Sequence, residues 1–328
     1  MGAVWAVDDQ GGYGFPVGDA GDWHGRKRFV SGIGGPIGEK TTWTGETCYL
    51  SALWALCNRF KRLRLQEGLK MRALVTGAGK RLGREMALYL AGRGYDVAVH
   101  YASSRKEAEA VVKEINAMGR RAVALRADLL IETQVEKLIP TAVQGLGGPL
   151  TVLVNNASVF EYDTIKTATR NSWDRHMESN LRAPFVLTQA FAAQVPQAGL
   201  DDAGERVARG LVVNMIDQRV HKLTPEFMTY TLAKMGLWAL TRTAAQGLAP
   251  DVRVNAIGPG PTLQGARQSE AHFAGQRAAT ILKRGANPAD ITAALGFFLD
   301  SPGVTGQMIA VDGGQHLGWQ TPDVLGVE

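Results

Sequence analysis

Cysteine is almost missing from this chain, since only Cys48 and Cys57 occur in 328 residues. Two cysteines in a chain of this length form neither a disulfide framework nor a metal-ligand pattern, so we expect no disulfide, no metal and a reducing, cytoplasmic location. Long apolar runs are missing too. The stretch from Cys48 to Cys57 is about half of the roughly 20 residues that span a bilayer, and the polar, glycine-rich residues before it do not resemble a secretion signal. The sequence therefore argues against a membrane protein.

The excess of positive over negative charge is also small. The chain has 36 Lys and Arg against 31 Asp and Glu, for a formal net charge of +5. No long basic run is interleaved with aromatic residues, as a nucleic-acid surface would require, so we expect a mixed, solvated surface and no nucleic-acid partner. The 45% of hydrophobic residues is ample for the core of a chain this long.

Residues 1–70 differ from the rest of the chain. Twelve glycines fall within the first 45 residues, and the segment holds four of the seven tryptophans without a sustained helix or strand period. One hypothesis is that Met71 is the natural start and that the preceding segment is a mis-assigned or disordered extension. The alternative is a lineage-specific arm in which Leu50–Leu65 forms a short basic helix that docks on the body or on a membrane surface.

From residue 71 to 328 we expect one domain, in which short apolar runs alternate with longer amphipathic ones. This pattern predicts an α/β fold of the Rossmann type: a doubly wound, seven-stranded parallel sheet with helices on both faces. The expected strands are Ala73–Thr76, Val97–Tyr101, Ala122–Arg126, Thr151–Asn155, Leu211–Ile216, Val252–Ile257 and Met308–Val311. The expected helices are Leu82–Gly92, Arg105–Ala117, Glu132–Gln144, Ser172–Gln194, Pro225–Gly247 and Pro288–Leu299.

A glycine-rich turn, Thr76-Gly-Ala-Gly-Lys-Arg-Leu-Gly83, joins the first strand to the first helix. In that position backbone amides at a helix N-terminus can face a pyrophosphate, which predicts a dinucleotide site. The second strand ends His100-Tyr-Ala-Ser-Ser-Arg105, without an acid to hold a ribose 2′-hydroxyl. Its hydroxyls and its arginine suit a 2′-phosphate, so NADPH is favoured over NADH. Ser103 and Ser104 could equally cap the next helix, and Asp128 could be an adenine neighbour or a loop residue.

Tyr230 and Lys234 lie four residues apart, on one face of a predicted helix. An ammonium one turn away favours the phenolate, so we expect Lys234 to bring the pKa of Tyr230 closer to the working pH for proton transfer. Asp217 precedes Tyr230 by thirteen residues, at the end of an apolar strand. An ionised carboxylate cannot donate a hydrogen bond to a ketone oxygen, but it can share a proton with the phenol, and such a pair suits protonation of a ring nitrogen.

Together these features resemble the short-chain dehydrogenase/reductase family over nearly all of residues 71–316. The matching motifs are the glycine turn, Asn155-Asn156-Ala157, Asn180, Tyr230 with Lys234, Pro259-Gly260 and Asp312-Gly313-Gly314. The resemblance implies that Asn180, Tyr230 and Lys234 are catalytic, with Asp217 where the family usually has serine. It also implies that Lys234 binds the nicotinamide ribose, that Asn180 bends its helix and holds a water, and that the chain forms a homotetramer.

The cofactor residues that we expect are Gly77, Arg81, Leu82, Gly83, His100, Tyr101, Ser103, Ser104, Arg105, Asp128, Leu129, Asn155, Ala157, Ser158, Tyr230, Lys234, Pro259 and Gly260.

Three further residues narrow the resemblance. Arg81 stands where most of the family has glycine, and Ser158 and Phe160 follow the fourth strand. With Asp217 they make the chain similar to the pteridine reductases and the related dihydromonapterin and dihydrofolate reductases. This implies NADPH-dependent reduction of a pterin ring, with Phe160 stacking the ring, Arg81 and Ser158 orienting its polar edge, and Tyr230 with Asp217 delivering the proton.

Two alternatives remain open. A carbonyl reductase acting on a ketone or acyl thioester needs only the fold and Tyr230, and a non-catalytic NADPH-binding protein needs only the fold. We also expect Pro261–Arg284 to form a lid over the substrate, and the tail from Gln315 to reach a neighbouring subunit.

Overall fold

The computed structural model describes residues 70–265 and 268–321. The predictions for the first 69 residues, including both cysteines and the helix at 50–65, lie outside the described residues. So do positions 266–267 of the expected lid and the end of the tail after residue 321.

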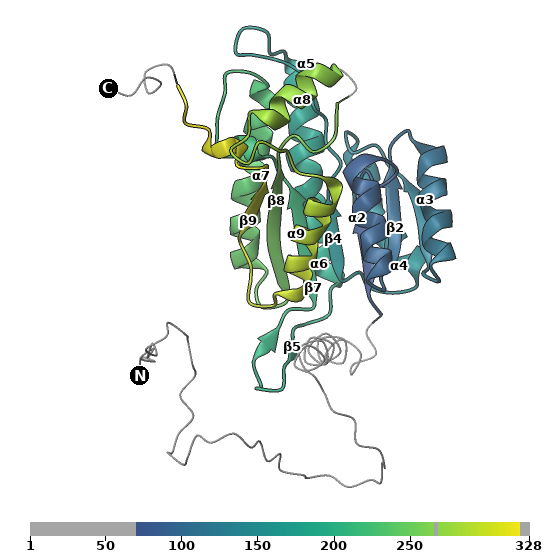
Figure 1. Ribbon diagram of the computed structural model, residues 1–328. Coiled ribbons are helices and arrows are strands. Elements are labelled where there is room, and N and C mark those ends of the chain that lie inside the picture. Colours follow the sequence, from purple (N-terminus) through teal and green to yellow (C-terminus); the bar gives the residue numbers. More distant parts are fainter. Residues whose placement is uncertain (1–69, 266–267, 322–328) are drawn as a thin grey trace, which may run out of the picture. The chain divides into compact units, whose positions relative to one another are not determined.

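The domain is built on a seven-stranded parallel sheet with helices on both faces, which confirms the predicted fold class (Figure 1). The strand order is β3-β2-β1-β4-β7-β8-β9. The strands are β1 (Arg72–Val75), β2 (Asp96–Tyr101), β3 (Ala122–Arg126), β4 (Val152–Asn155), β7 (Gly210–Met215), β8 (Val252–Pro259) and β9 (Met308–Val311). A small antiparallel hairpin, β5 (Gly199–Leu200) with β6 (Arg206–Val207), occupies the polar stretch before β7.

Because both faces of the sheet are covered, its central strands are apolar at successive positions. In β1, Ala73 and Val75 belong to the core on one face, whereas Leu74 belongs to the core on the other. Helices α2 (Arg81–Gly92), α3 (Arg105–Ala117) and α9 (Pro288–Asp300) pack on the first face. Helices α4 (Glu132–Leu146), α6 (Ala183–Gln194) and α7 (Met228–Gly247) supply the second core.

One predicted helix is wrong. The stretch expected as a continuous helix from Ser172 to Gln194 consists of α5 (Arg170–Met177), the π-helical turn η1 (Glu178–Arg182) and α6. The π-helical turn carries Asn180 at its centre, so the local irregularity expected around this residue is present. The helix predicted from Pro225 begins only at Met228, after Phe227 in the left-handed region at φ 55°.

The strand order reverses between β1 and β4, and ligands of such sheets bind beyond the carboxyl ends of the strands at that point. The turn after β1 contacts the loop after β4 there, and Arg81 at the end of this turn contacts the segment after β8. Two 3-10 turns, η2 (Gln218–Val220) and η3 (Gln315–Leu317), follow β7 and β9. Helix α8 (Glu270–Ala278) lies on the surface within the expected lid, and none of its residues is buried.

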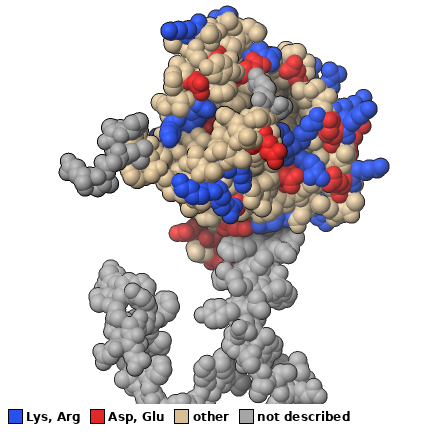
Figure 2. Space-filling view, turned by 45° about the horizontal axis from the view of Figure 1, so that its top comes forward, with Lys and Arg blue, Asp and Glu red and all other residues tan. Residues whose placement is uncertain are grey.

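The surface carries both signs of charge. Figure 2 shows Lys and Arg side chains interspersed with Asp and Glu on the visible face. Over the described ranges, no helix combines the length and the apolar character that crossing a membrane requires.

Candidate active site

The glycine turn has the geometry of an anion cradle. Gly77 lies at φ +63°, and a Cβ on Gly83, in the first turn of α2, would stand 2.2 Å from the Gly77 carbonyl oxygen, so this close approach requires glycine at position 83. Lys80, the N-cap of α2, makes no side-chain cap hydrogen bond within the described part of the chain, and the first turn has no acidic residue. The first amides of α2 are therefore available to a phosphate, and the turn fits a dinucleotide.

Side chains from β1 and the β4 loop hold this turn. The Thr76 hydroxyl accepts hydrogen bonds from the amides of Asn156 (2.8 Å) and Ala157 (2.9 Å), while Asn156 Nδ2 donates to the Thr76 carbonyl at 2.8 Å. The predicted cofactor residue Asn155 points elsewhere: its side chain is buried and Nδ2 donates to Asn214 Oδ1 at 2.8 Å. Its role is to join β4 to β7, because its side chain faces into the sheet layer.

His100, another expected cofactor residue, also turns its side chain into the domain. Its ring is 1% exposed; Nδ1 accepts from the Gly77 amide at 3.0 Å, and Nε2 faces the Ala127 carbonyl at 3.0 Å. Burial lowers the pKa of His100 to about 4, so the ring is neutral and Nε2 carries the hydrogen. His100 therefore holds the glycine turn through the Gly77 amide, and neither of its ring nitrogens is free to bind a cofactor.

The residues expected at a 2′-phosphate lie together at the end of β2 and the start of α3. Tyr101 is buried, whereas Ser103 and Arg105 are exposed, and Arg105 Nε donates to Glu109 at 2.7 Å. Ser104 occupies the N-cap position of α3 but makes no side-chain cap hydrogen bond within the described ranges, so capping does not account for its hydroxyl.

Other expected cofactor residues have packing roles. Asp128 Oδ1 accepts from the Leu130 amide at 3.0 Å, which supports its interpretation as a loop residue. Leu129 is buried in the core with α4 and α6, so its side chain does not face the cofactor crevice. Leu82 packs on the first core, next to the turn. Gly260 follows Pro259 where a Cβ would stand 2.6 Å from Asp312 Cβ, so close packing requires this glycine.

The predicted reactive residues meet at the carboxyl end of β7. Tyr230 Oη donates to Asp217 Oδ2 at 2.9 Å, while Asp217 Oδ1 accepts from the Arg219 amide at 2.8 Å. Asp217 therefore caps the η2 turn with one oxygen and holds the phenol with the other. The Tyr230 side chain is 5% exposed.

The protonation of this pair differs from our expectation. Burial raises the pKa of Asp217, although hydrogen bonds from Arg219 and Tyr230 act against the shift. Burial and then the Asp217 carboxylate raise the pKa of Tyr230 well above its usual value. The expectation that Lys234 brings the pKa of Tyr230 down is thus wrong for this arrangement, because the phenol is buried and the carboxylate contacts it directly. The raised pKa of Tyr230 keeps the proton on the phenol, which donates it in the hydrogen bond to Asp217.

Lys234 and Asn180 each bind backbone. Lys234 Nζ donates to the Met215 carbonyl at 2.8 Å and lies 5.6 Å from the centroid of the Tyr230 ring. Burial lowers the pKa of Lys234 to about 8. Asn180 is fully buried; its Oδ1 accepts from the Val159 amide at 2.9 Å and its Nδ2 donates to the Val159 carbonyl at 2.8 Å. The side chain of Asn180 therefore fixes the loop after β4, while the water assigned to it stays a prediction.

An aromatic wall stands beside the phenol. Phe160, 45% exposed, contacts Tyr230 edge-on with ring centroids 4.7 Å apart. Phe227 stacks on Phe160 with centroids 4.4 Å apart and an interplanar angle of 6°. Ser158, on the same loop, is exposed and donates to the Val159 carbonyl at 3.2 Å. The structure thus brings Ser158, Phe160, Asp217 and Tyr230 together, and one face of the Phe160 ring is covered by Phe227.

Arg81 belongs to this region but reaches another partner. Its backbone lies at φ 54°, in the left-handed region that explains why glycine is common here in the family. Its guanidinium donates to the carbonyls of Gln264 (2.7 Å) and Leu263 (3.0 Å). Arg81 therefore ties the glycine turn to the segment after β8.

Sequence reasoning missed Arg219 and Phe227. The Arg219 guanidinium lies 5.0 Å from the centroid of the Phe227 ring, and its Nε is buried without a hydrogen-bond partner among the described residues. Its charge acts against the rise in the pKa values of both Asp217 and Tyr230. The position of Arg219 two residues after Asp217 was the available signal. A second missed group, Asp163, His176 and Thr229, lies behind Tyr230.

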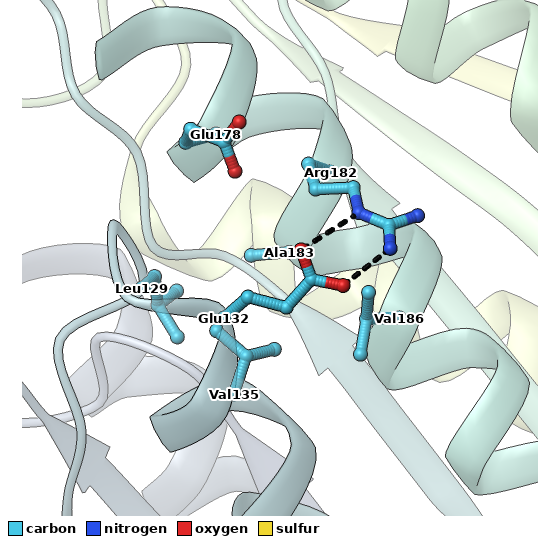
Figure 3. Close-up of a pocket in the computed structure, with 7 residues that line it drawn as sticks. All are labelled: Leu129, Glu132, Val135, Glu178, Arg182, Ala183 and Val186. Carbon is cyan, nitrogen blue, oxygen red and sulfur yellow. Dashed lines mark hydrogen bonds and ion pairs between the residues drawn. The ribbon is translucent and has the colours of Figure 1, made fainter. Parts of the chain in front are cut away.

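The small recess in Figure 3 is separate from the residues around Tyr230. It lies between α4 and the η1 to α6 region, and an ion pair between Arg182 and Glu132 crosses it. Its remaining lining residues are Leu129, Val135, Glu178, Ala183 and Val186.

Known proteins resemble this chain over most of the described domain. The FolM alternative dihydrofolate reductase 1 of Brucella canis, solved with NADP, superposes with a TM-score of 0.72 at 42% identity, covering 77% of this chain and 97% of that chain. A short chain dehydrogenase of Burkholderia cenocepacia, also solved with NADP, superposes with a TM-score of 0.68 at 29% identity, covering 75% and 97%. The 3-oxoacyl-[acyl-carrier-protein] reductase FabG of Staphylococcus epidermidis is 33% identical over 250 residues, which are 75% of this chain and 98% of FabG.

The profile of the short chain dehydrogenase family matches residues 71–274, which contain the glycine turn, Asn180, Asp217, Tyr230 and Lys234. This chain therefore belongs to the short-chain dehydrogenase/reductase family of oxidoreductases.

Proposed function

We propose that this protein is an NADPH-dependent reductase of pterin rings, which converts a dihydropterin or dihydrofolate to its tetrahydro form and can also accept oxidised pterins. The observation that carries the proposal is the 2.9 Å hydrogen bond from Tyr230 Oη to Asp217 Oδ2, beside the exposed ring of Phe160. The likeness to the FolM alternative dihydrofolate reductase, 42% identical, supports it.

The cofactor follows from the residues around the glycine turn. The amides at the N-terminus of α2 suit the pyrophosphate, and the exposed Ser103 and Arg105 suit a 2′-phosphate, with no acid at the end of β2 to oppose it. The NADP in both structural relatives described above supports this choice. When bound, NADPH supplies the hydride, and the chain supplies orientation and a proton.

The proton chemistry distinguishes nitrogen from a ketone oxygen. The Asp217 carboxylate accepts the phenol's hydrogen bond and cannot donate one, so it offers no partner to a ketone oxygen at that position. Tyr230 instead gives its proton to the ring nitrogen that becomes basic on reduction, and Asp217 stabilises the phenol until that transfer. In its charged form Lys234, held by the Met215 carbonyl, stabilises the phenolate after the transfer.

The substrate ring would lie against the aromatic wall. Phe160 offers a flat apolar surface next to Tyr230, and Ser158 on the same loop offers a hydroxyl to the polar edge of the ring. Arg81 completes this edge if its guanidinium leaves the carbonyls of Leu263 and Gln264. Pro261–Arg284 would then act as the lid.

The test is an assay of the purified full chain. NADPH oxidation at 340 nm is followed with dihydromonapterin, dihydrobiopterin and dihydrofolate, with a panel of ketones and an acetoacetyl thioester as the comparison. Turnover of a pterin supports the proposal, and no turnover with any pterin ends it.

A second candidate function is reduction of a ketone or acyl thioester. The 33% identity to FabG over 250 residues favours it. Turnover of the thioester or ketones without any turnover of pterins would replace the first proposal by this one. Tight NADPH binding without turnover of either class would instead indicate a non-catalytic NADPH-binding protein.

We also propose a homotetramer in the cytoplasm. Phe185 on α6 and Leu232 and Met235 on α7 are apolar side chains between 37% and 43% exposed, on the helices through which the family usually assembles. Light scattering after size exclusion tests this, and a mass equal to one chain of 35.3 kDa would contradict it.

A further inference from the structure

A buried polar network lies behind Tyr230, in residues that no part of the proposed chemistry uses. We propose that Asp163, Thr229 and His176 are positioning residues that hold Tyr230 and the loop carrying Phe160 in a fixed relation. Asp163 and Thr229 are each 2% exposed, and His176 is fully buried. The inference deepens the proposed function and rests on it where the substrate is a pterin.

Asp163 serves as a cap for α7 from a distant part of the chain. The amide of Thr229 donates to Asp163 Oδ1 at 3.1 Å, and the Thr229 hydroxyl donates to Oδ2 at 2.5 Å. The Met228 amide also donates to the Asp163 backbone carbonyl at 3.2 Å. Phe227, the N-cap residue, makes no side-chain cap hydrogen bond within the described ranges, so Asp163 satisfies the first amides of the helix that carries the proton donor.

His176 continues the network to the loop after β4. The Glu161 amide donates to His176 Nε2 at 3.1 Å, so the hydrogen of the neutral ring is on Nδ1. Nδ1 then donates to Thr229 Oγ1 at 2.7 Å, and that hydroxyl donates to Asp163. The hydrogen bonds therefore form one continuous chain from the Glu161 amide through His176 and Thr229 to Asp163, in which each donor meets an acceptor. The His176 ring also contacts Tyr230 edge-on, with centroids 5.9 Å apart.

Hydrogen bonds from Asn180 and His176 hold the backbone on both sides of Phe160. Phe160 lies between Val159, which Asn180 holds, and Glu161, which His176 holds. Thr229 immediately precedes Tyr230. The contact of 4.7 Å between the Phe160 and Tyr230 rings is therefore set by two anchored backbone segments. A displacement of about 1 Å at such a site costs on the order of 10²-fold in rate.

Two threonines that flank Tyr230 give a matched test. Thr229 and Thr231 are both buried, but Thr231 Oγ1 has no hydrogen-bond partner among the described residues, whereas Thr229 Oγ1 has two. Thr229→Val and Thr231→Val each replace a hydroxyl by a methyl group of similar size. We expect Thr229→Val to lower kcat by about 10- to 100-fold. For Thr231→Val we expect a change of at most about twofold, and the Kd for NADPH should change no more than this in either variant.

Rescue separates positioning from stability. Thr229→Ser keeps the hydroxyl and should retain kcat to within about twofold. If Thr229→Val does not fold, His176→Phe keeps a ring beside Tyr230 but removes both nitrogen contacts, and the same loss of kcat is expected. Equal kcat for Thr229→Val and Thr231→Val, with only a lower Tm for the former, would reduce the network to a structural role and overturn the inference.

The choice of substrate separates the test of the positioning network from the test of the pterin proposal. The variants are compared on whichever class, pterin or ketone, the wild-type chain reduces. Ketone turnover alone removes the pterin proposal while the network is still tested, and a wild-type chain that turns over neither class removes both.

Discussion

Replacing Asp217 by asparagine tests the reactive pair most directly. The carboxylate accepts two hydrogen bonds, from the Arg219 amide at 2.8 Å and from Tyr230 Oη at 2.9 Å. Asparagine keeps a carbonyl oxygen for Arg219 but presents an amide NH2 to the phenol, which must then turn and accept. A hydrogen bond to a charged group contributes about 1.5–3 kcal/mol and a neutral one about 0.5–1.5, so the contact to Tyr230 weakens by roughly 1 kcal/mol.

The larger effect is on the reaction. Without the carboxylate the pKa of Tyr230 falls, because the charge of Asp217 is one of the causes that raise it. The phenol also loses its oriented proton, and general acid catalysis is worth about 10²- to 10⁴-fold, so we expect kcat for dihydropterin reduction to fall about 10²- to 10³-fold. Asp217→Ser should show the same pattern, since serine restores a ketone-type donor but no proton-sharing partner.

The thermal stability of Asp217→Asn should not fall along with its activity. A carboxyl group whose pKa is raised above its usual 3.8 adds stability at low pH, and this is lost as pH rises through the raised value. Ionisation of the buried Asp217 therefore costs stability, and Asp217→Asn, which cannot ionise, should keep or raise Tm. Steady-state kinetics measures kcat, fluorescence titration measures NADPH affinity, and thermal melts measure Tm. A kcat within about twofold of wild type, or equal losses in kcat and NADPH affinity, would refute the reasoning.

Three further predictions follow from buried groups. The pKa of Lys234 is lowered to about 8, so its stability contribution is present above its usual 10.5 and lost as pH falls through about 8. Lys234→Met should raise Tm at pH 7 yet abolish turnover, and wild-type kcat/KM should decline above pH 8; a flat profile would contradict this. The lowered pKa of His100, about 4, means that its contribution is present above 6.5 and lost as pH falls through about 4. His100→Asn should therefore cost about 1–3 kcal/mol at pH 7, measured by urea melts, with a smaller difference near pH 4. In Gly83→Ala the new Cβ would meet the Gly77 carbonyl oxygen at 2.2 Å, so NADPH binding measured by calorimetry should be lost, and retained affinity would show that the turn can shift.

The sequence alone determined the α/β architecture and pointed to the candidate reactive side chains. Seven apolar runs separated by amphipathic ones leave little choice but a covered parallel sheet, because apolar faces on both sides of a strand must be buried. Spacing on one helix placed Tyr230 and Lys234 together, and the thirteen-residue interval placed Asp217 at the end of β7 beside them. These are local periods and topological rules, which a single sequence carries.

Only the tertiary structure decided which of these residues do what. Asn155 and His100 belong to motifs beside the crevice, yet their side chains turn inward to Asn214 and to the Gly77 amide. The pKa of Tyr230 rises instead of falling because of burial and the contact with Asp217, and burial is a property of the assembled fold. The contact from Asp163 to Thr229 joins residues 66 positions apart, and no local pattern marks a partner chosen by long-range packing.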